Sequence, residues 1–211
     1  SPSSAASDVY KRQLGDWLFL IRKWLNNKVV GVVGGRVINL RRRRIDPDFN
    51  LNLLPYAADV LTKATGFVFL DTKHGPRYVE YTTPLMAIKM SLIKKGLRYD
   101  LEYRGTGYRE ESDLQEQVRR LDYRIVFEPR FYVYHLNLEE GGNRAIQEIA
   151  TRFYWKTRNH TYFTLKHRKP AYKLILSNLI IMAYALLHGG KAFTSAMQGL
   201  REALSLKHNQ E

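Results

Sequence analysis

Strand-like and helix-like stretches alternate along most of this chain, and this alternation limits the fold more than any other feature of the sequence. Runs rich in β-branched or aromatic residues, the strand pattern, cover residues 29–33, 36–40, 77–83, 124–128 and 131–135. Apolar residues at helical spacing cover residues 16–26, 84–95, 112–121, 144–167, 171–188 and 191–206. Strands that alternate with helices predict an α/β domain built around a sheet.

Glycine and proline mark several of the expected boundaries. Gly34 and Gly35 predict a close turn or bulge between the first two strand runs. Gly96 is expected to end the helix over 84–95, and Pro129 interrupts the last two strand runs. The stretch over 97–109 is loop-like.

Every pattern after Pro170 is helical, which predicts a boundary between residues 14–168 and a tail over 169–211. Within the tail, residues 174–187 are mostly apolar, but this run is shorter than the roughly 18 residues expected of a membrane-spanning helix. The tail helix is expected to lie on a membrane surface or to pack against protein. Basic residues that would favour the membrane surface stand beside it: Lys166, His167, Arg168, Lys169 and Lys173.

The chain is strongly basic, with a formal net charge of +14. This charge predicts an anionic partner, which can be nucleic acid, a phosphorylated small molecule or an acidic membrane surface. The run Arg41–Arg44 fits a nucleic-acid patch, a lipid contact or a solvated loop. There is no cysteine, which excludes disulfides, cysteine zinc sites and a cysteine nucleophile.

Residues 3–13 show neither a helical nor a strand period. One permitted back-translation of this segment resembles an adapter that transposases add to DNA in sequencing libraries. We therefore expect residues 1–13 to be non-native, as in a metagenomic fragment, and the natural sequence to start near Leu14. The chain would then be the C-terminal part of a longer protein. Source DNA that encodes these residues with other codons would contradict this expectation.

An acidic cluster, Glu110, Glu111 and Asp113, comes directly before apolar residues at helical spacing. This pattern predicts three carboxylates on the first turn of a helix, where the helix dipole favours negative charge. Either the cluster is a solvent-facing cap, or one carboxylate is a catalytic base at the mouth of a cleft. Neighbouring carboxylates raise one another's pKa and the dipole lowers it, so the sequence leaves the net direction open.

Basic residues follow one face of the helix over 144–167. Arg152, Lys156 and Asn159 are spaced at i, i+4 and i+7, while Arg158 is offset from them. Such a face suits a diphosphate, because arginine can bind phosphate through two parallel hydrogen bonds. A solvated surface is the alternative.

An ordered set of short pieces resembles a known enzyme family. The pieces are Asp16-Trp17-Leu18, Val30–Val37, Met86–Lys89, Lys95-Gly96, Tyr99-Asp100, Arg109–Leu114, Tyr123–Pro129, Tyr134–Leu136, Gly141-Gly142 and Arg158–His160. Over residues 14–168 this set resembles the C-terminal half of family 2 glycosyltransferases. The resemblance implies part of a GT-A fold, a Rossmann-like sheet domain with helices, followed by the helical tail.

The resemblance implies inverting transfer of a sugar from a nucleotide-sugar donor to a hydroxyl of a saccharide or lipid-linked acceptor. The family motif Glu-Asp-x-Asp-Leu is matched by the run from Glu110 to Leu114, which puts Glu111 in the place of the catalytic base. Glutamate for aspartate departs from the motif and lengthens the reach by one methylene. Asp113 therefore remains a rival base, and Glu110 completes the catalytic set.

The resemblance also implies a divalent metal, Mn²⁺ or Mg²⁺, in the full-length enzyme. His135 is implied as a metal ligand or diphosphate contact, and a histidine satisfied by backbone is the alternative. The donor diphosphate is implied to contact Arg109, Arg158 and Asn159. The run Asp46-Pro47-Asp48 lies downstream of the family's metal motif, so we assign it no metal role.

The family's donor-binding half would precede Asp16, so these 211 residues alone are expected to show no transferase activity. A second hypothesis is a non-catalytic basic module that binds a membrane surface or nucleic acid. Three carboxylates in a cleft disfavour nucleic acid, because a phosphate-binding surface avoids negative charge. The expected location is cytoplasmic, with peripheral contact at the inner face of the membrane.

Overall fold

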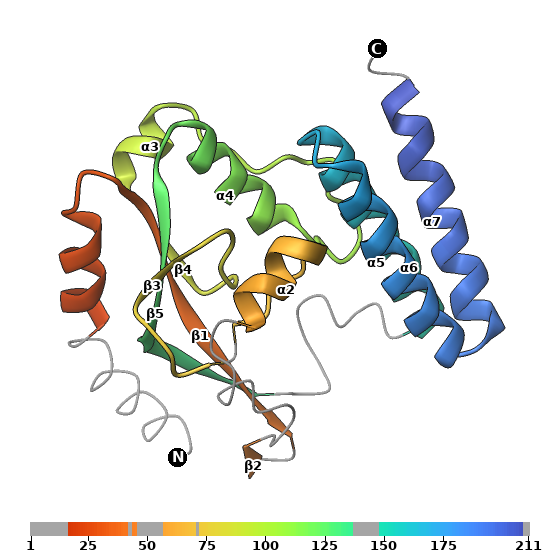
Figure 1. The fold of residues 1–211 in the computed structure, drawn as a ribbon, viewed down its shortest axis with the longest axis horizontal. Coiled ribbons are helices and arrows are strands. Elements are labelled where there is room, and N and C mark those ends of the chain that lie inside the picture. Colours follow the sequence, from red (N-terminus) through yellow and green to blue (C-terminus); the bar gives the residue numbers. More distant parts are fainter. Residues whose placement is uncertain (1–16, 42–43, 46–56, 71, 137–147, 209–211) are drawn as a thin grey trace, which may run out of the picture. The chain divides into compact units, whose positions relative to one another are not determined.

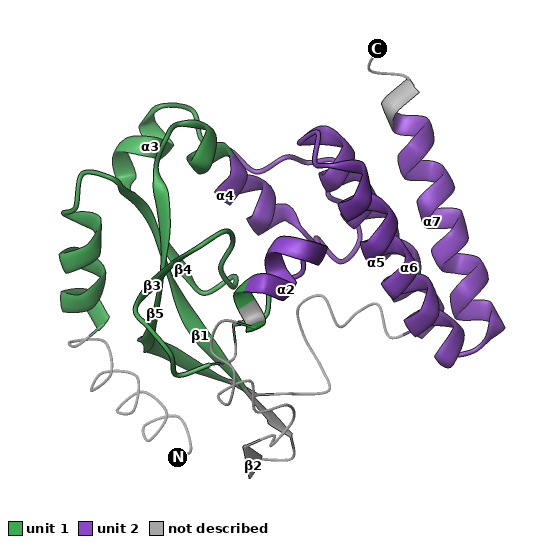
Figure 2. Cartoon of the chain, viewed as in Figure 1, with its two compact units in different colours: residues 1–59, 68–97, 117–137 green, residues 60–67, 98–116, 138–211 purple. Residues whose placement is uncertain are grey.

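The computed structural model describes residues 17–41, 44–45, 57–70, 72–136 and 148–208. The described part is a mixed α/β protein, as the alternating patterns predicted (Figure 1). The chain divides into two units (Figure 2). Unit 1 comprises residues 1–59, 68–97 and 117–137, and unit 2 comprises residues 60–67, 98–116 and 138–211. The expected adapter-derived segment, 1–13, lies outside the described residues, as do Asp46-Pro47-Asp48 and Gly141-Gly142.

Unit 1 is built on a five-stranded mixed sheet whose central strand is β1 (Val30–Arg41). Strand β5 (Arg124–Leu136) pairs with β1 in parallel, and β3 (Arg77–Val79) pairs with β5 in antiparallel orientation. The short strands β4 (Met86–Ile88) and β2 (Arg44–Ile45) also pair antiparallel with β1, at different positions along it.

Strands β1 and β5 each run continuously where the sequence predicted two shorter strands. Their register shifts between Gly34 and Arg36, which confirms the predicted bulge. Gly34 pairs with Phe127 and Arg36 pairs with Tyr132. Pro129 therefore falls within the irregular stretch, where the missing proline N–H interrupts no regular ladder.

The predicted helix over 84–95 is wrong in its first half. Met86–Ile88 forms strand β4, and helix α3 covers only Met90–Lys94. The cause is tertiary pairing, because β4 pairs with β1 and the Gly35 N–H donates to the Leu85 carbonyl at 2.7 Å. A short apolar run fits a strand as well as a helix, and its partners decide which it forms.

The core of unit 1 lies on both faces of the sheet, since consecutive residues of β1 and β5 are buried. A helix over residues 17–25 carries Trp24 and Leu25, which pack against the cluster of Val30, Val33 and Val126. The Trp24 indole also donates to a Glu128 carboxylate oxygen at 3.1 Å. This helix confirms the pattern predicted over 16–26.

Three helices form the greater part of unit 2: α5 (Ile149–Lys166), α6 (Ala171–Leu187) and α7 (Gly190–His208). Small residues on α7 allow it to approach α5 closely, because a Cβ on Gly199 would lie 2.3 Å from the Tyr154 carbonyl oxygen. Their shared apolar cluster is Phe153, Ile181, Met182, Ala185, Ala192 and Ala196. The predicted boundary at Pro170 falls between α5 and α6, which belong to the same unit.

Two further helices complete the described elements. Helix α4 (Glu110–Arg120) confirms the predicted helix over 112–121, and α2 (Ala57–Thr65) was not predicted. The basic run Arg41–Arg44 ends β1 at Arg41 and begins β2 at Arg44, and its side chains lie outside the described residues. Within the described part of the chain, no helix combines the length and apolar character needed to cross a membrane.

Candidate functional site

Helix α4 begins at Glu110, and its first turn carries Glu110, Glu111 and Asp113, as predicted. The loop before it bends through backbone angles that side chains other than glycine rarely adopt. Gly107 has a φ of 63° and Arg109 a φ of 80°. A Cβ on Gly107 would lie 2.9 Å from the Glu110 carboxyl carbon, which can move aside, so the positive φ rather than the space favours glycine here. Strain of this kind at a non-glycine residue is typical of functional sites.

Asp113 is fully buried and is held by three side chains of unit 2. Its Oδ1 atom accepts a hydrogen bond from the Tyr103 hydroxyl at 3.1 Å, and it lies 2.7 Å from His167 Nε2 and 2.6 Å from Lys166 Nζ. Burial by itself raises the pKa of Asp113, but the hydrogen bonds from His167 and Lys166 outweigh burial and lower the pKa to about 2. Its placement therefore favours an anchor over a catalytic base.

Glu110 and Glu111 are in a different situation, because both are half-buried and neither forms an ion pair with another described residue. Burial raises the pKa of both carboxyls. For Glu111 its own backbone N–H and Arg109 oppose that rise, while Glu110 adds to it. The sequence did not determine whether the pKa of these carboxyls is raised or lowered. For Glu110 and Glu111 the pKa is raised, as expected of a general base.

Tyr99 lies close to the same two carboxylates. Burial raises the pKa of the Tyr99 phenol, and the negative charges of Glu111 and Glu110 raise it further. The Tyr99 residue as a whole is 53% exposed. Tyr99 thus adds a neutral hydrogen-bonding group beside the acidic turn.

Arg109 is buried among groups of its own chain. Its guanidinium donates to the Gly66 carbonyl, to Ser112 Oγ at 3.2 Å and to His160 Nδ1 at 3.1 Å. Burial, Arg109 and Lys156 hold the pKa of His160 well below its usual range, so its ring is neutral and can accept. The placement favours support of the α4 start over the predicted contact with a donor diphosphate.

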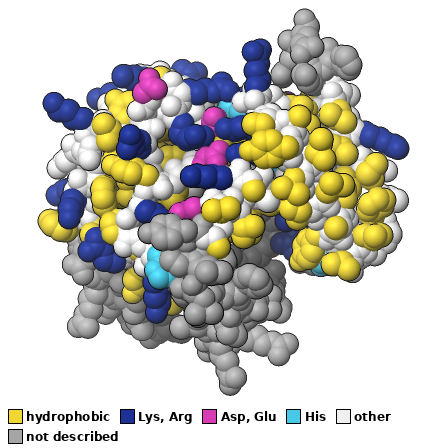
Figure 3. Space-filling model, viewed as in Figure 1, with side chains coloured by type: hydrophobic (Ala, Val, Ile, Leu, Met, Phe, Trp, Pro, Cys, Tyr) yellow, Lys and Arg dark blue, Asp and Glu magenta, His cyan; other side chains and the backbone are white. Residues whose placement is uncertain are grey.

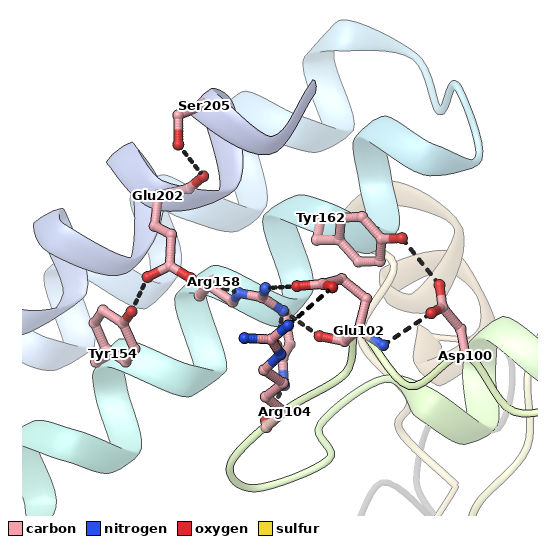
Figure 4. A network of polar contacts seen from close by, with 9 residues as sticks. Asp100, Glu102, Arg104, Tyr154, Arg158, Tyr162, Glu202 and Ser205 are labelled. Carbon is pink, nitrogen blue, oxygen red and sulfur yellow. Dashed lines mark hydrogen bonds and ion pairs between the residues drawn. The ribbon is translucent and has the colours of Figure 1, made fainter. Parts of the chain in front are cut away.

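Arg158 and Asn159 are also committed to the fold. Figure 4 shows Arg158 of α5 pointing toward Glu102 and toward Glu202 of α7, and it forms ion pairs with both. Asn159 donates to the Arg104 carbonyl at 2.9 Å. Both side chains are almost fully buried, so the geometry favours tethering of the 100–104 segment over the predicted diphosphate contact.

Two other cations of the predicted basic face line a pocket of about 350 Å³ in unit 2. Arg152 and Lys156 lie one turn apart on α5, and Asn159 does not join them. Lys156 Nζ lies 5.7 Å from the ring centre of Tyr108 and 5.7 Å from that of Tyr184. This pocket combines positive charge with aromatic walls.

The predicted metal ligand, His135, belongs to β5, but its side chain lies outside the described residues. Among the residues that the structure does describe, no group of three histidine or carboxylate side chains is placed to hold a metal ion. The divalent metal expected for the full-length enzyme therefore stays a prediction, and we derive no step through one.

The sequence did not predict which side chains contact each of the three carboxylates. Lys166 and His167 were interpreted only as basic neighbours of the tail, yet both lie within hydrogen-bond distance of Asp113, and His167 is 54 positions away along the chain. No local pattern marks such a pairing. The pocket could have been suspected from the spacing of Arg152 and Lys156, but its aromatic walls come from two other segments.

Comparisons with known proteins assign the chain to no family: no family model, curated protein or solved structure matches it. A mixed α/β class hosts many unrelated activities, so the fold alone does not choose one. The function must therefore be argued from the side chains described above.

Proposed function

We propose that this chain carries the acceptor-side part of an inverting, nucleotide-sugar-dependent glycosyltransferase of the GT-A type, with Glu111 as the general base. The observation that supports it best is the contrast within the first turn of α4. Asp113 is ionised and fully engaged, whereas Glu111 is half-buried, has a raised pKa and forms no ion pair with a described residue. One turn thus holds an anchoring carboxylate and a carboxylate able to take a proton.

In the proposed reaction the Glu111 carboxylate removes the proton of the acceptor hydroxyl. The acceptor oxygen forms a bond to the anomeric carbon of the donor sugar, on the face opposite the nucleoside diphosphate. The bond from that carbon to the diphosphate breaks, and the diphosphate leaves with the electron pair. A positioned base contributes about 10²–10⁴-fold to such a step, because an alcohol is a poor nucleophile near neutral pH.

Neighbouring groups fit this role for Glu111. Arg109 brings positive charge near the carboxylate, which opposes the rise in the Glu111 pKa caused by burial. Ser112 and Gly66 hold Arg109 in place, so the helix start is supported from within unit 2. Tyr99 is a half-exposed residue near both carboxylates, where we place the acceptor sugar.

The activity test compares Glu111→Gln with the matched variant Glu110→Gln in an enzyme completed by its donor-binding half. We expect Glu111→Gln to lower kcat by about 10²–10⁴-fold and to leave donor Kd nearly unchanged, since only proton removal is lost. Glu110→Gln should reduce kcat much less. Full turnover by Glu111→Gln would refute the assignment, and turnover by the 211 residues alone would refute the need for a second half.

A titration tests the same assignment on the chain itself. Carboxyl carbon resonances followed by NMR should show Glu110 and Glu111 titrating above their ordinary pKa of 4.5, and Asp113 below its ordinary 3.8. Glu111→Gln and Asp113→Asn identify the two resonances by their disappearance. A Glu111 resonance that titrates below its ordinary pKa, or an Asp113 resonance that titrates above its own, would contradict the proposed division of roles.

A second function, contact with a membrane surface, is favoured by one observation on α6. Its outward face exposes large apolar side chains, while Ser177, Asn178, Ile181, Met182 and Ala185 point inward. Figure 3 shows hydrophobic side chains gathered over the helices of unit 2. The exposed side chains on α6 are Tyr172, Ile175, Leu176, Leu179, Ile180, Tyr184, Leu186 and Leu187.

The basic residues beside α6 contribute less to such binding than the sequence suggested. Lys166 pairs with Asp100 and Asp113, His167 with Asp113, and Lys169 with Glu116. Because the charges of the two lysines are neutralised within the chain, we expect apolar contact to supply most of the membrane affinity.

Co-sedimentation with phosphatidylcholine and phosphatidylglycerol vesicles tests this contact. We expect Leu179→Glu to weaken binding about 10-fold or more, because a leucine buried in the interface contributes roughly 1.5–3 kcal/mol. The control Leu204→Glu changes an exposed leucine on α7 and should have little effect. Equal loss in both variants, or no binding to either vesicle, would rule out α6 as the contact.

A further inference from the structure

The pocket beside α5 has the size and the walls of a small-molecule site. Its volume of about 350 Å³ falls at the lower end of the range for ligand pockets. Its lining comes from three segments of unit 2, with Tyr108 before α4, Arg152 and Lys156 on α5, and Tyr184 on α6. The lining contains two cations and no carboxylate.

Lys156 is the unusual member of this lining. Its ammonium contacts the faces of Tyr108 and Tyr184, but within the described part of the chain it forms no hydrogen bond or ion pair. Burial lowers the pKa of Lys156, and the positive charge of Arg109 lowers it further. A half-buried cation without an anion is costly, so an anionic ligand at this point would be stabilising.

Arg152 and the aromatic wall extend the same site. Arg152 lies at i−4 from Lys156 and therefore on the same side of α5. Phe153, Tyr184 and His188 contact one another edge to face or at a tilt, with ring centres 4.4 to 5.5 Å apart. These rings form a continuous apolar surface beside the two cations.

We propose that this pocket binds a phosphate monoester carried on an aromatic or other planar group. The phosphate lies between Lys156 and Arg152, and the planar group rests against Tyr184 and Phe153. Two cations suit a dianion better than a carboxylate, and arginine can meet phosphate oxygens through two hydrogen bonds. The site does not depend on glycosyl transfer, because none of its groups belongs to the acidic turn of α4.

Calorimetric titration of the whole chain tests the site with four probes: phenyl phosphate, inorganic phosphate, benzoate and phenol. Phenyl phosphate should bind most tightly, because only it presents both the dianion and the ring. Lys156→Met should weaken phenyl phosphate binding about 10-fold or more, as a lost charge-assisted contact does. Tyr184→Leu should weaken phenyl phosphate but leave inorganic phosphate nearly unchanged.

The matched control is Arg201→Met, which removes one exposed positive charge from α7 outside the pocket. Equal weakening by Lys156→Met and Arg201→Met would overturn the site, since binding would then follow net charge alone. Benzoate binding as tightly as phenyl phosphate would overturn the phosphate assignment, and no binding of phenyl phosphate would overturn both. If Lys156→Met does not fold, NMR of the unmodified chain decides: shifts confined to Tyr108, Phe153 and Tyr184 support the pocket, and shifts elsewhere refute it.

Discussion

Unit 2 holds its buried and half-buried charges in two ways. Arg158 and Asp113 each meet opposite charges of the same chain, in networks that join the 100–104 segment, α4, α5 and α7. Lys156 and Glu111 have no such ion pair among the described residues. The same residue types therefore serve as anchors in one region and remain open to an outside partner in the other.

The physical reason lies in desolvation. A charge removed from water costs several kcal/mol unless an opposite charge and hydrogen bonds replace the water. Arg158 and Asp113 have that replacement built in, so removing either leaves its partners unsatisfied. Lys156 and Glu111 lack it, so their removal should cost the fold little and should affect binding or catalysis instead.

The largest expected effect on the free energy of unfolding is that of changing the anchoring residue Arg158. Arg158→Met should lower the free energy of unfolding by about 2–4 kcal/mol, because Glu102 and Glu202 lose a buried partner. Urea denaturation followed by circular dichroism measures it, with Arg201→Met as the control for loss of one positive charge. If Arg158→Met lowers the free energy of unfolding no more than Arg201→Met does, the distinction between ion-paired anchors and charges without an ion pair among the described residues is wrong.

Asp113→Asn should lower the free energy of unfolding by about 2 kcal/mol near neutral pH, since the Asp113 pKa falls from 3.8 to about 2 on folding. Because folding lowers the Asp113 pKa, the ionised carboxyl stabilises the fold at pH values above its unfolded pKa of 3.8. This stabilisation disappears as the pH falls through about 2. The difference between the two proteins should therefore shrink between about pH 4 and pH 2. Denaturation at several pH values measures it, and a constant difference would contradict the ion-paired state.

The smallest expected effect on the free energy of unfolding is that of changing Lys156, and it has the opposite sign. Lys156→Met should leave the free energy of unfolding unchanged or raise it by up to about 1 kcal/mol, because a half-buried cation that has no ion pair with a described residue becomes an apolar side chain of similar length. Thermal and urea unfolding without added phosphate measure the change. A loss as large as that expected for Arg158→Met would show that Lys156 is an anchor as well.

Local patterns predicted much of the fold. The helices over 17–25 and α4, the strands around Val30 and Phe127, the bulge at Gly34 and the helix end at Gly96 all follow from periodicity and glycine placement. The errors arose where a segment's partner decided its form. Met86–Ile88 became a strand because β1 offers it an edge, whereas α2 was missed although its apolar residues recur at helical spacing.

The candidate site divides in the same way. The sequence alone determined that Glu110, Glu111 and Asp113 share the first helical turn, because the acidic residues come directly before an apolar helical stripe. Only the tertiary structure gave them different environments, by bringing Lys166 and His167 to Asp113 and no ion-pair partner from the described residues to Glu111. It likewise buried Arg158 among carboxylates and left Lys156 among rings. Charge pairing depends on residues far apart along the chain, so no local spacing can specify it.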